Sequence, residues 1–243
     1  MNEIIHRNAS RGLADHGWLQ SRHTFSFADY DNPQRVNFGL LRVINDDVVK
    51  PSMGFDTHPH ANMEIVSIPL AGALRHQDSM GNSYVIRTGE VQVMSAGSGL
   101  THSEYNNSDH DDVKFLQIWV FPKRQDIPPR YGQKRFDAAG RENRFQVLVS
   151  PEDSDKTIWI NQDAWFSLAD IQSGTRIRYQ KHLAENGVYF FVIEGRVEID
   201  GVSIERRDGM GLVDDRNHLL AATQDAQVLA IEVPMSHRKI AEA

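Results

Sequence analysis

Two short motifs carry the residue types from which metal sites are built. The first is His58-Pro59-His60, and the second, further along the chain, is His102-Ser103-Glu104. Residues i and i+2 of a β-strand project to the same face, so each motif directs two side chains to one side. Two such strands side by side in a closed barrel bring three imidazoles and one carboxylate together. Four ionisable groups gathered there would otherwise carry a large desolvation cost, so a metal site is the favoured interpretation.

The ligand types narrow the choice of metal. Neutral imidazoles and one carboxylate leave a divalent ion with positive charge and open positions for substrate and water. This donor set suits Fe(II), Mn, Co, Ni, Cu or Zn rather than Ca or Mg. The chain has 11 histidines and no cysteine, which excludes disulfides, thiolate metal sites, iron–sulfur clusters and a thiol nucleophile. We expect one divalent transition metal ion per chain, with Fe(II) as the first choice.

Short apolar stretches separated by turn residues must position these motifs. Strands are expected at 37–43, 64–70, 89–95, 113–120, 144–149, 164–170, 189–194 and 228–233. No window keeps an apolar period of 3.6 residues over several turns, so helices are expected only near 128–137 and 236–243. The pattern predicts an all-β protein.

A faint internal repeat suggests two related halves. Gly81 and Gly89 are separated by eight residues, as are Gly201 and Gly209, and each first glycine is followed two positions later by serine. Hairpins can resemble one another by chance, but two copies of one small β-barrel explain the pattern better. We therefore predict a metal-binding barrel at 1–127, a linker at 128–143 around two prolines, and a second barrel at 144–243.

The second half lacks the ligand pairs of the first. The histidines of the first half lie 14 and 12 residues before Gly72, and the same steps back from Gly195 reach Lys181 and Leu183. His182 falls between them, and His218 has no carboxylate two positions later. The second barrel is therefore expected to bind no metal and to act as a scaffold.

Composition excludes several classes of partner. Lys and Arg number 26 against 33 Asp and Glu, so a net charge of −7 gives no general attraction for nucleic acid. No apolar run approaches the ~18 residues of a membrane span, and the first residues carry no signal-peptide pattern. We expect a soluble cytoplasmic protein.

Several segments resemble the pirin family of the cupin superfamily. They are His-Gly-Trp-Leu at 16–19, His-Thr-Phe-Ser-Phe at 23–27, Leu-Arg-Val-Ile-Asn-Asp at 41–46, Gly-Phe-Asp-Thr-His-Pro-His at 54–60, Met-Glu-Ile at 63–65, His-Gln-Asp-Ser-Met-Gly-Asn at 76–82 and His-Ser-Glu-Tyr-Asn at 102–106. The chain departs from the general cupin motifs in two places. Gly54 precedes the first histidine by four positions rather than six, and Ser95 stands where proline is usual.

The resemblance implies a bicupin, with two tandem jelly-roll barrels and the metal in the first. The family's ligands match His58, His60, His102 and Glu104. Cupins in general use the glutamate of the first motif, here Glu64, as the carboxylate ligand. We favour Glu104, with Glu64 turned outward or supporting the site from behind.

Some bacterial members of this family act as quercetin 2,3-dioxygenases, which implies a flavonol and O2 as substrates and carbon monoxide as a product. Glu104 would then be the catalytic base, and Phe25, Phe38, Phe55 and Trp119 are candidate walls of the substrate pocket. His76 is a further candidate for the mouth of the barrel. The alternative is a metal-dependent binding protein, typical of other pirins, which modulates a protein partner without turnover. Family members also suggest a monomer.

Overall fold

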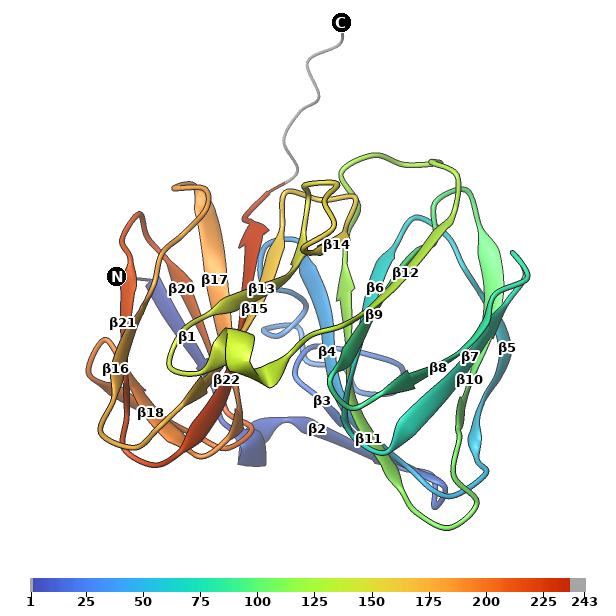
Figure 1. The fold of residues 1–243 in the computed structure, drawn as a ribbon, viewed down its shortest axis with the longest axis horizontal. Coiled ribbons are helices and arrows are strands. Elements are labelled where there is room, and N and C mark those ends of the chain that lie inside the picture. The colour runs from blue at the N-terminus through green and yellow to red at the C-terminus, as the bar shows by residue number, and fades with distance from the viewer. Residues whose placement is uncertain (1, 237–243) are drawn as a thin grey trace, which may run out of the picture.

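The computed structural model describes residues 2–236 and consists almost wholly of β-strands. Its strands form two barrels that lie side by side (Figure 1). Two short 3-10 helices, η1 (Asn8–Ser10) and η2 (Ala138–Arg141), are the helical elements of this part of the chain. None of the helices within residues 2–236 is long and apolar enough to cross a membrane. The predicted all-β class is therefore confirmed.

The first barrel pairs a seven-stranded sheet with a four-stranded sheet. The strand orders are β12-β9-β6-β11-β4-β3-β2 and β5-β10-β7-β8. The bounds are β2 (Gly12–Asp15), β3 (Leu19–His23), β4 (Leu41–Val49), β5 (Gly54–His60), β6 (Glu64–Ala71), β7 (Ala73–Asp78), β8 (Ser83–Arg87), β9 (Glu90–Ser95), β10 (Leu100–Asn106), β11 (Val113–Val120) and β12 (Arg130–Arg135).

The second barrel repeats this arrangement. Its sheets have the orders β1-β20-β17-β22-β15-β13-β14 and β16-β21-β18-β19. The bounds are β1 (Asn2–His6), β13 (Gln146–Ser150), β14 (Ile158–Trp159), β15 (Trp165–Ile171), β16 (Arg176–Tyr179), β17 (Asn186–Glu194), β18 (Arg196–Ile199), β19 (Val202–Glu205), β20 (Gly209–Val213), β21 (His218–Ala222) and β22 (Ala226–Pro234).

Glycines at equivalent turns show that the predicted internal repeat is real. Gly72 joins β6 to β7 with φ 78°, and Gly195 joins β17 to β18 with φ 79°. Gly81 and Gly201, in the next hairpin of each barrel, both have φ 89°. These left-handed conformations favour glycine, because a Cβ atom would crowd the backbone. The two tandem barrels therefore share the same arrangement of strands.

The segment expected to be helical near 128–137 is instead strand β12, and that prediction is wrong. Arg130 to Arg135 pair antiparallel with Ser95 to Glu90 of β9, so they extend the large sheet of the first barrel. Tyr131 also stacks on Tyr84 with ring centroids 5.2 Å apart. The free edge of β9 supplies hydrogen bonds that no local sequence pattern reveals. The second expected helix, at 236–243, lies almost wholly outside the described residues.

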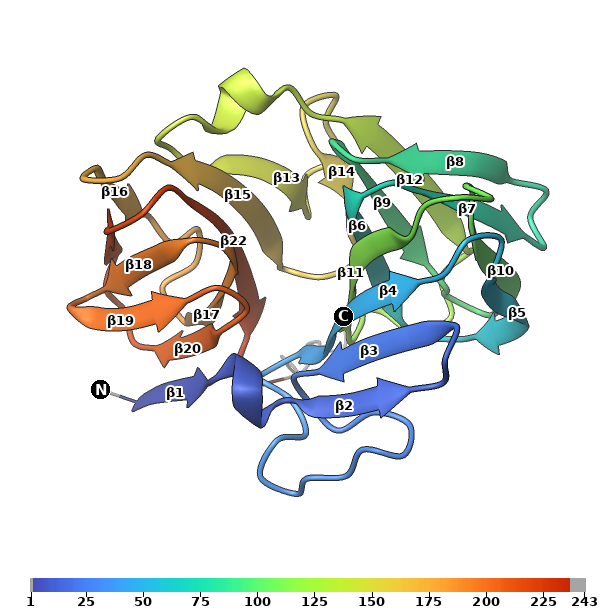
Figure 2. The same ribbon diagram turned by 90° about the horizontal axis from the view of Figure 1, so that it is seen from below.

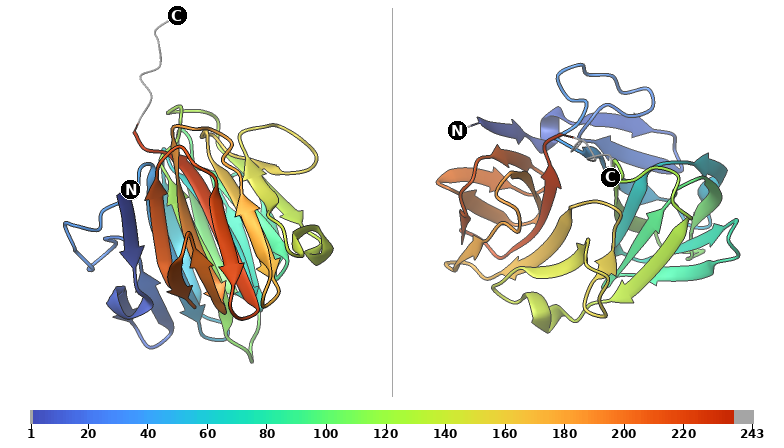
Figure 3. Two further views of the ribbon diagram at one scale, coloured as in Figure 1. Left: turned by 90° about the vertical axis from the view of Figure 1, so that its left-hand side faces the viewer. Right: turned by 90° about the horizontal axis from the view of Figure 1, so that it is seen from above.

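Strand β1 is part of the second barrel. It precedes the first barrel in the sequence but pairs with β20, in a register from Asn2 opposite Val213 to His6 opposite Gly209. Figure 2 and the right-hand view of Figure 3 show this blue strand beside the orange strands of the second barrel. The barrel boundaries at residues 127 and 144 stay predictions. Strand β1 belongs to the second barrel although it comes first in the sequence, and β12, in the expected linker, belongs to the first barrel.

The interiors of the two barrels differ in chemistry. The second barrel has one continuous apolar core, with buried residues such as Phe190, Leu212 and Val228. In the first barrel two separate apolar clusters occupy the interior, one around Phe115 and the other around Met94. Buried polar side chains occupy the interior between them, and this is where the candidate site lies.

Candidate metal centre

Strands β5 and β10 bring three histidines together. His102 of β10 lies opposite His58 of β5 in the antiparallel register, and His60 lies two residues beyond His58 on the same face. Ring centroids are 4.4 Å apart for His58 and His102, and 4.9 Å apart for His60 and each of the other two. One ring nitrogen from each lies within 4.8 Å of the others. The three histidines of the two motifs therefore lie in one cluster, as the spacing predicted.

Hydrogen bonds leave the ring nitrogens of this cluster free to ligate. His58 Nδ1 donates to the backbone oxygen of Asp56 at 2.7 Å, which leaves Nε2 with its lone pair. His102 Nε2 is buried and has no hydrogen-bond partner among the described residues. Burial, with His58 and His60 close by, lowers the pKa of His102 to about 2, and burial lowers the pKa of His60 to about 4.

A divalent transition metal ion fits this donor set. Neutral imidazoles bind such ions through their lone pairs, and an unpartnered buried nitrogen is costly unless something binds it. The cluster is therefore able to hold a metal ion, and the chemistry of its donors excludes neither iron nor nickel.

His76 and Asp78 of β7 support the cluster from behind. Asp78 Oδ2 accepts a hydrogen bond from His76 Nε2 at 3.1 Å, and the pKa of Asp78 is lowered, with hydrogen bonds from Asn82 and His76 outweighing its burial. His76 Nδ1 then faces His102 Nδ1 at 3.5 Å. This chain fixes the ring of His102 and directs its Nε2 to the other histidines. His76, which the sequence offered as a candidate for the barrel mouth, is fully buried inside the barrel.

Glu104 lies beside His102 and is held by two side chains. Gln117 Nε2 donates to Glu104 Oε2 at 2.7 Å, and Ser67 Oγ donates to Oε1 at 3.4 Å. Trp119 Nε1 in turn donates to Gln117 Oε1 at 3.2 Å, which fixes the amide. Burial raises the pKa of Glu104 to about 7. Glu104 can share a site with His102 and His76, and its role as fourth ligand stays a prediction.

A cavity of about 680 Å³ opens onto this cluster. Its aromatic lining is formed by Trp18, Phe27, Tyr30, Phe55 and Trp119, and its polar lining by His16, Ser21, His23, Asp29, Asn45, Asp47, His58, His60, Glu104 and Gln117. Two of the four expected pocket walls are therefore present, namely Phe55 and Trp119. Phe25 and Phe38 are not, because they are buried in the core between the two barrels. His23 and Asp47, which the sequence reasoning did not single out as pocket residues, line the cavity.

Glu64 faces away from the histidines. Its Oε2 accepts hydrogen bonds from Ser95 Oγ at 2.7 Å and from the backbone N–H of Asn161 at 3.1 Å. Its even spacing from His58 and His60 does not bring it to their face, because the chain turns at Asn62 (φ 50°) and β6 belongs to the other sheet. This geometry agrees with the preference for Glu104 over Glu64.

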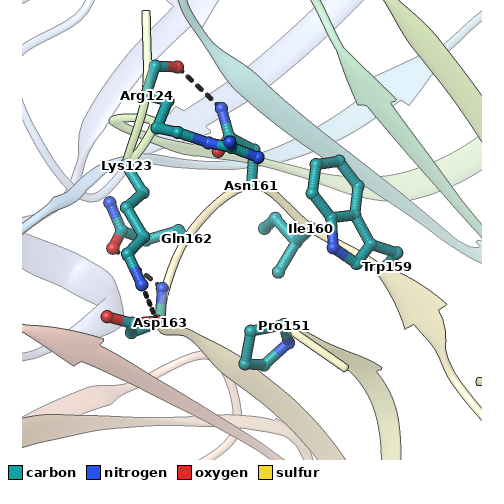
Figure 4. A pocket seen from close by; sticks show the side chains of 8 residues that line it. All are labelled: Lys123, Arg124, Pro151, Trp159, Ile160, Asn161, Gln162 and Asp163. Carbon is teal, nitrogen blue, oxygen red and sulfur yellow. Dashed lines mark hydrogen bonds and ion pairs between the residues drawn. The ribbon is translucent and has the colours of Figure 1, made fainter. Parts of the chain in front are cut away.

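The segment that Glu64 holds lines a smaller hollow of about 330 Å³ at the junction of the barrels (Figure 4). Asn161 Nδ2 donates to the backbone oxygen of Arg124 at 2.7 Å, and Lys123 pairs with Asp163 at 2.8 Å. Within residues 2–236, the groups of side chains that could hold a metal ion all lie in the first barrel. This hollow therefore lies where the two barrels meet and is separate from the histidine cluster.

The second barrel gathers no group of side chains that could hold a metal ion, within the part of the chain that the structure describes. Tyr179 of β16 lies opposite His218 of β21 as His58 lies opposite His102. Leu220 lies opposite Ile199 of β18 as Glu104 lies opposite His76, and Tyr179, His218 and Leu220 are all buried. This register places Tyr179, rather than Lys181, at the first of the two positions that the counting from Gly195 indicated. The absence of metal from this barrel stays a prediction, now with a structural basis.

Two tandem jelly-roll barrels with a histidine cluster inside one of them define a bicupin. Residues 6–120 match the family model described as Pirin, and residues 147–233 match that of the quercetinase C-terminal cupin domain. The chain belongs to the pirin family.

Similar proteins have the same overall structure. A quercetin 2,3-dioxygenase of Escherichia coli is 43% identical over 228 residues, which cover 92% of this chain and 95% of that protein. A pirin-like protein of Caulobacter vibrioides is 40% identical over 223 residues, covering 91% and 95%. The crystal structure of the bacterial pirin YhhW from Escherichia coli, in complex with nickel(II), matches with a TM-score of 0.91 at 39% identity and covers 96% of this chain and 99% of that one.

Proposed function

We propose that this protein is a metal-dependent dioxygenase of the quercetin 2,3-dioxygenase type, which cleaves a flavonol with O2 and releases carbon monoxide. The observation that carries the proposal is the position of the histidine cluster and Glu104 at the base of an aromatic-walled cavity. A volume of about 680 Å³ is within the range of small-molecule sites and is large enough for a three-ring ligand. The name of the Escherichia coli relative supports the same activity.

The proposed roles follow from the chemistry of each side chain. His58, His60 and His102 hold the metal ion, and Glu104 completes the set. When bound, the ion supplies a Lewis acid that lowers the pKa of the flavonol 3-hydroxyl and a site for oxygen chemistry. Glu104 takes the proton of that hydroxyl as general base, with Gln117 and Ser67 keeping its two oxygens in place.

The aromatic walls orient the ligand and exclude water. Trp119 packs edge-on against both His60 (4.9 Å between ring centroids) and Phe27 (5.3 Å). Trp18 packs edge-on against Phe55 at 5.3 Å. These rings line the cavity that opens onto the histidine cluster, and their flat apolar faces suit a planar polyphenol. They also keep bulk water from the electron-rich substrate.

The identity of the metal is part of the proposal. Fe(II) is the first choice, and the nickel(II) complex of the relative makes Ni the leading alternative. A cytoplasmic location and a monomeric state belong to the same proposal. The rival function, metal-dependent binding of a protein partner without turnover, needs no cavity of this size above the metal.

The decisive experiment joins metal content with turnover. The purified protein is stripped of metal, reloaded separately with Fe(II), Mn, Co, Ni, Cu or Zn, and assayed for quercetin loss, O2 uptake and carbon monoxide release. We expect turnover that depends on the metal and falls by about 10²–10⁴-fold in Glu104→Gln, the range of a lost general base. Full metal occupancy with no turnover for any ion would overturn the dioxygenase proposal and favour partner binding.

A further inference from the structure

Two adjacent carboxylates of strand β4 point to opposite faces of the sheet. Asp46 faces the junction of the two barrels, where its oxygens lie 3.0 Å from Arg11 and 3.5 Å from Arg207. Asp47 faces the interior of the first barrel and lines the cavity that opens onto the histidine cluster. Asp46 therefore has buried cations as partners, and Asp47 lies on the side of the ligand.

The carboxyl group of Asp47 is buried but incompletely paired. The residue is 2% exposed, and its Oδ1 has no hydrogen-bond partner within residues 2–236. Ser21 lies opposite Asp47 in the register of β3 and β4, and its hydroxyl is a hydrogen-bond partner of the carboxyl group. This hydroxyl does not reach Oδ1. A buried polar atom without a partner is costly, and native proteins keep few of them unless they serve a ligand. Burial raises the pKa of Asp47 to about 7, so the group is ionised above that pH, and its Oδ1 is then an acceptor that lacks a donor.

Asp47 is separate from the metal centre but on the same inner wall. Gln117, which holds Glu104, lies opposite Asn45 in the register of β11 and β4. Asp47 is two residues further along β4, about 7 Å from Asn45 on the same face. The aromatic rings of Trp18 and Phe55 line the same cavity as this wall and the histidines. A flat ligand held at the metal can therefore extend one edge to Asp47.

We propose that Asp47 Oδ1 accepts a hydrogen bond from a second hydroxyl group of the ligand, one that does not bind the metal. The cavity then recognises an aromatic compound at two points: at the metal, through adjacent oxygens, and at Asp47, through a hydroxyl on another part of the ring system. This inference rests on the proposed function and narrows its substrates to polyhydroxylated flavonols. A flavonol whose single hydroxyl binds the metal leaves Asp47 without a donor and binds less tightly.

The test measures binding rather than turnover. Zinc-loaded protein under nitrogen is titrated with quercetin, which has several ring hydroxyls, and with 3-hydroxyflavone, whose one hydroxyl is next to the carbonyl. Quenching of the fluorescence of Trp18 and Trp119, which line the cavity, reports the dissociation constants. The variants are Asp47→Leu, which keeps the shape without the acceptor, and Asp47→Asn, which keeps a neutral acceptor. Asp29→Leu is the matched control, because it removes an exposed carboxylate from the same cavity lining.

Above pH 7, where Asp47 is ionised, we expect the wild type to prefer quercetin over 3-hydroxyflavone by roughly tenfold to a hundredfold, the effect of a hydrogen bond to a charged group. Asp47→Leu removes most of that preference by weakening quercetin alone, Asp47→Asn has an intermediate effect, and Asp29→Leu keeps it. An unchanged preference in both Asp47 variants, or an equal loss in Asp29→Leu, overturns the role of Asp47 and leaves the dioxygenase proposal intact. Failure of the wild type to bind either flavonol overturns the substrate class itself.

Discussion

The carboxylate of Glu64 accepts the backbone N–H of Asn161 at 3.1 Å, so a side chain of the first barrel holds the segment that leads into the second. Glu64 is fully buried, and its Oε1 has no partner within the described residues. Burial raises its pKa to about 7, against the opposing effect of the hydrogen bonds from Ser95 and Asn161. The junction between the barrels therefore contains a carboxyl group that stays protonated in the folded protein below about pH 7.

The raised pKa of Glu64 predicts a pH-dependent stability. The folded state keeps this proton up to about pH 7, whereas the unfolded chain loses it near the ordinary value of 4.5. The contribution of Glu64 to the free energy of unfolding is therefore fully present below pH 4.5 and is lost as pH rises to about 7. Glu64→Gln keeps the acceptor and cannot ionise. We expect its advantage over the wild type to grow by ~2–3 kcal/mol between pH 5 and 8.

Urea unfolding of metal-free wild type and Glu64→Gln at several pH values in that range measures this difference. Because the other buried carboxyl groups are common to both proteins, the difference isolates Glu64. A constant gap across the range would show that the carboxyl group titrates normally.

Removal of His60 is expected to abolish metal binding without unfolding the chain. His60 is half-buried at the end of β5 and contributes one of three clustered imidazoles. His60→Ala leaves two, which is too few for tight binding in competition with a chelator. Metal analysis after dialysis and the melting temperature of the metal-free protein are the two measurements. His16→Ala, which alters the same cavity away from the cluster, provides the control, and stoichiometric metal in His60→Ala would refute the ligand assignment.

Total metal content is expected to be one ion per chain. Among the described residues, the groups of side chains that could hold a metal ion all lie in the first barrel. In the second barrel, His218 Nδ1 donates to Asp200 at 2.9 Å, and the phenol of Tyr179 opposite it donates to Glu232 at 3.0 Å. Elemental analysis of protein loaded in excess metal and then desalted gives the ratio directly. Two tightly held ions per chain would contradict this assignment.

Loss of Asp46 is expected to destabilise the junction between the barrels strongly. The side chains of Arg11 and Arg207 are 1% and 7% exposed, and both have Asp46 as an ion partner. Asp46→Ala leaves these buried cations undercompensated, at a cost of about 3–5 kcal/mol. Asp112→Ala breaks an exposed pair with Lys50 and is expected to cost less than about 1 kcal/mol. Thermal or urea unfolding compares the two variants. Similar losses in the free energy of unfolding would show that the buried pair stabilises the fold no more than the exposed pair does.

Most of the histidine cluster could be predicted from local spacing. His58, His60 and His102 meet because the i, i+2 rule holds along single strands and because β5 and β10 are neighbours. Glu64 shows where the rule stops. Its even spacing was counted across Asn62, where the chain leaves one sheet and enters the other, so the parity of the two strands is unrelated.

Features that depend on pairing between distant segments were not predictable. Nothing in residues 130–135 alone indicates that β9 has a free edge to receive them, and nothing in the first residues indicates β20 as a partner. The cavity role of Asp47 was hidden for the same reason. Asp46 and Asp47 look alike in the sequence, and only the alternation of β4 between two different environments distinguishes them.

Strand β1 has a consequence for how the protein is made. Among the described strands it leaves the ribosome first, yet its partner β20 (Gly209–Val213) follows about 200 residues later. The first barrel can fold while synthesis continues, but β1 remains an unpaired segment until β20 has been translated. A chain that is terminated before β20 therefore keeps this segment open to proteases.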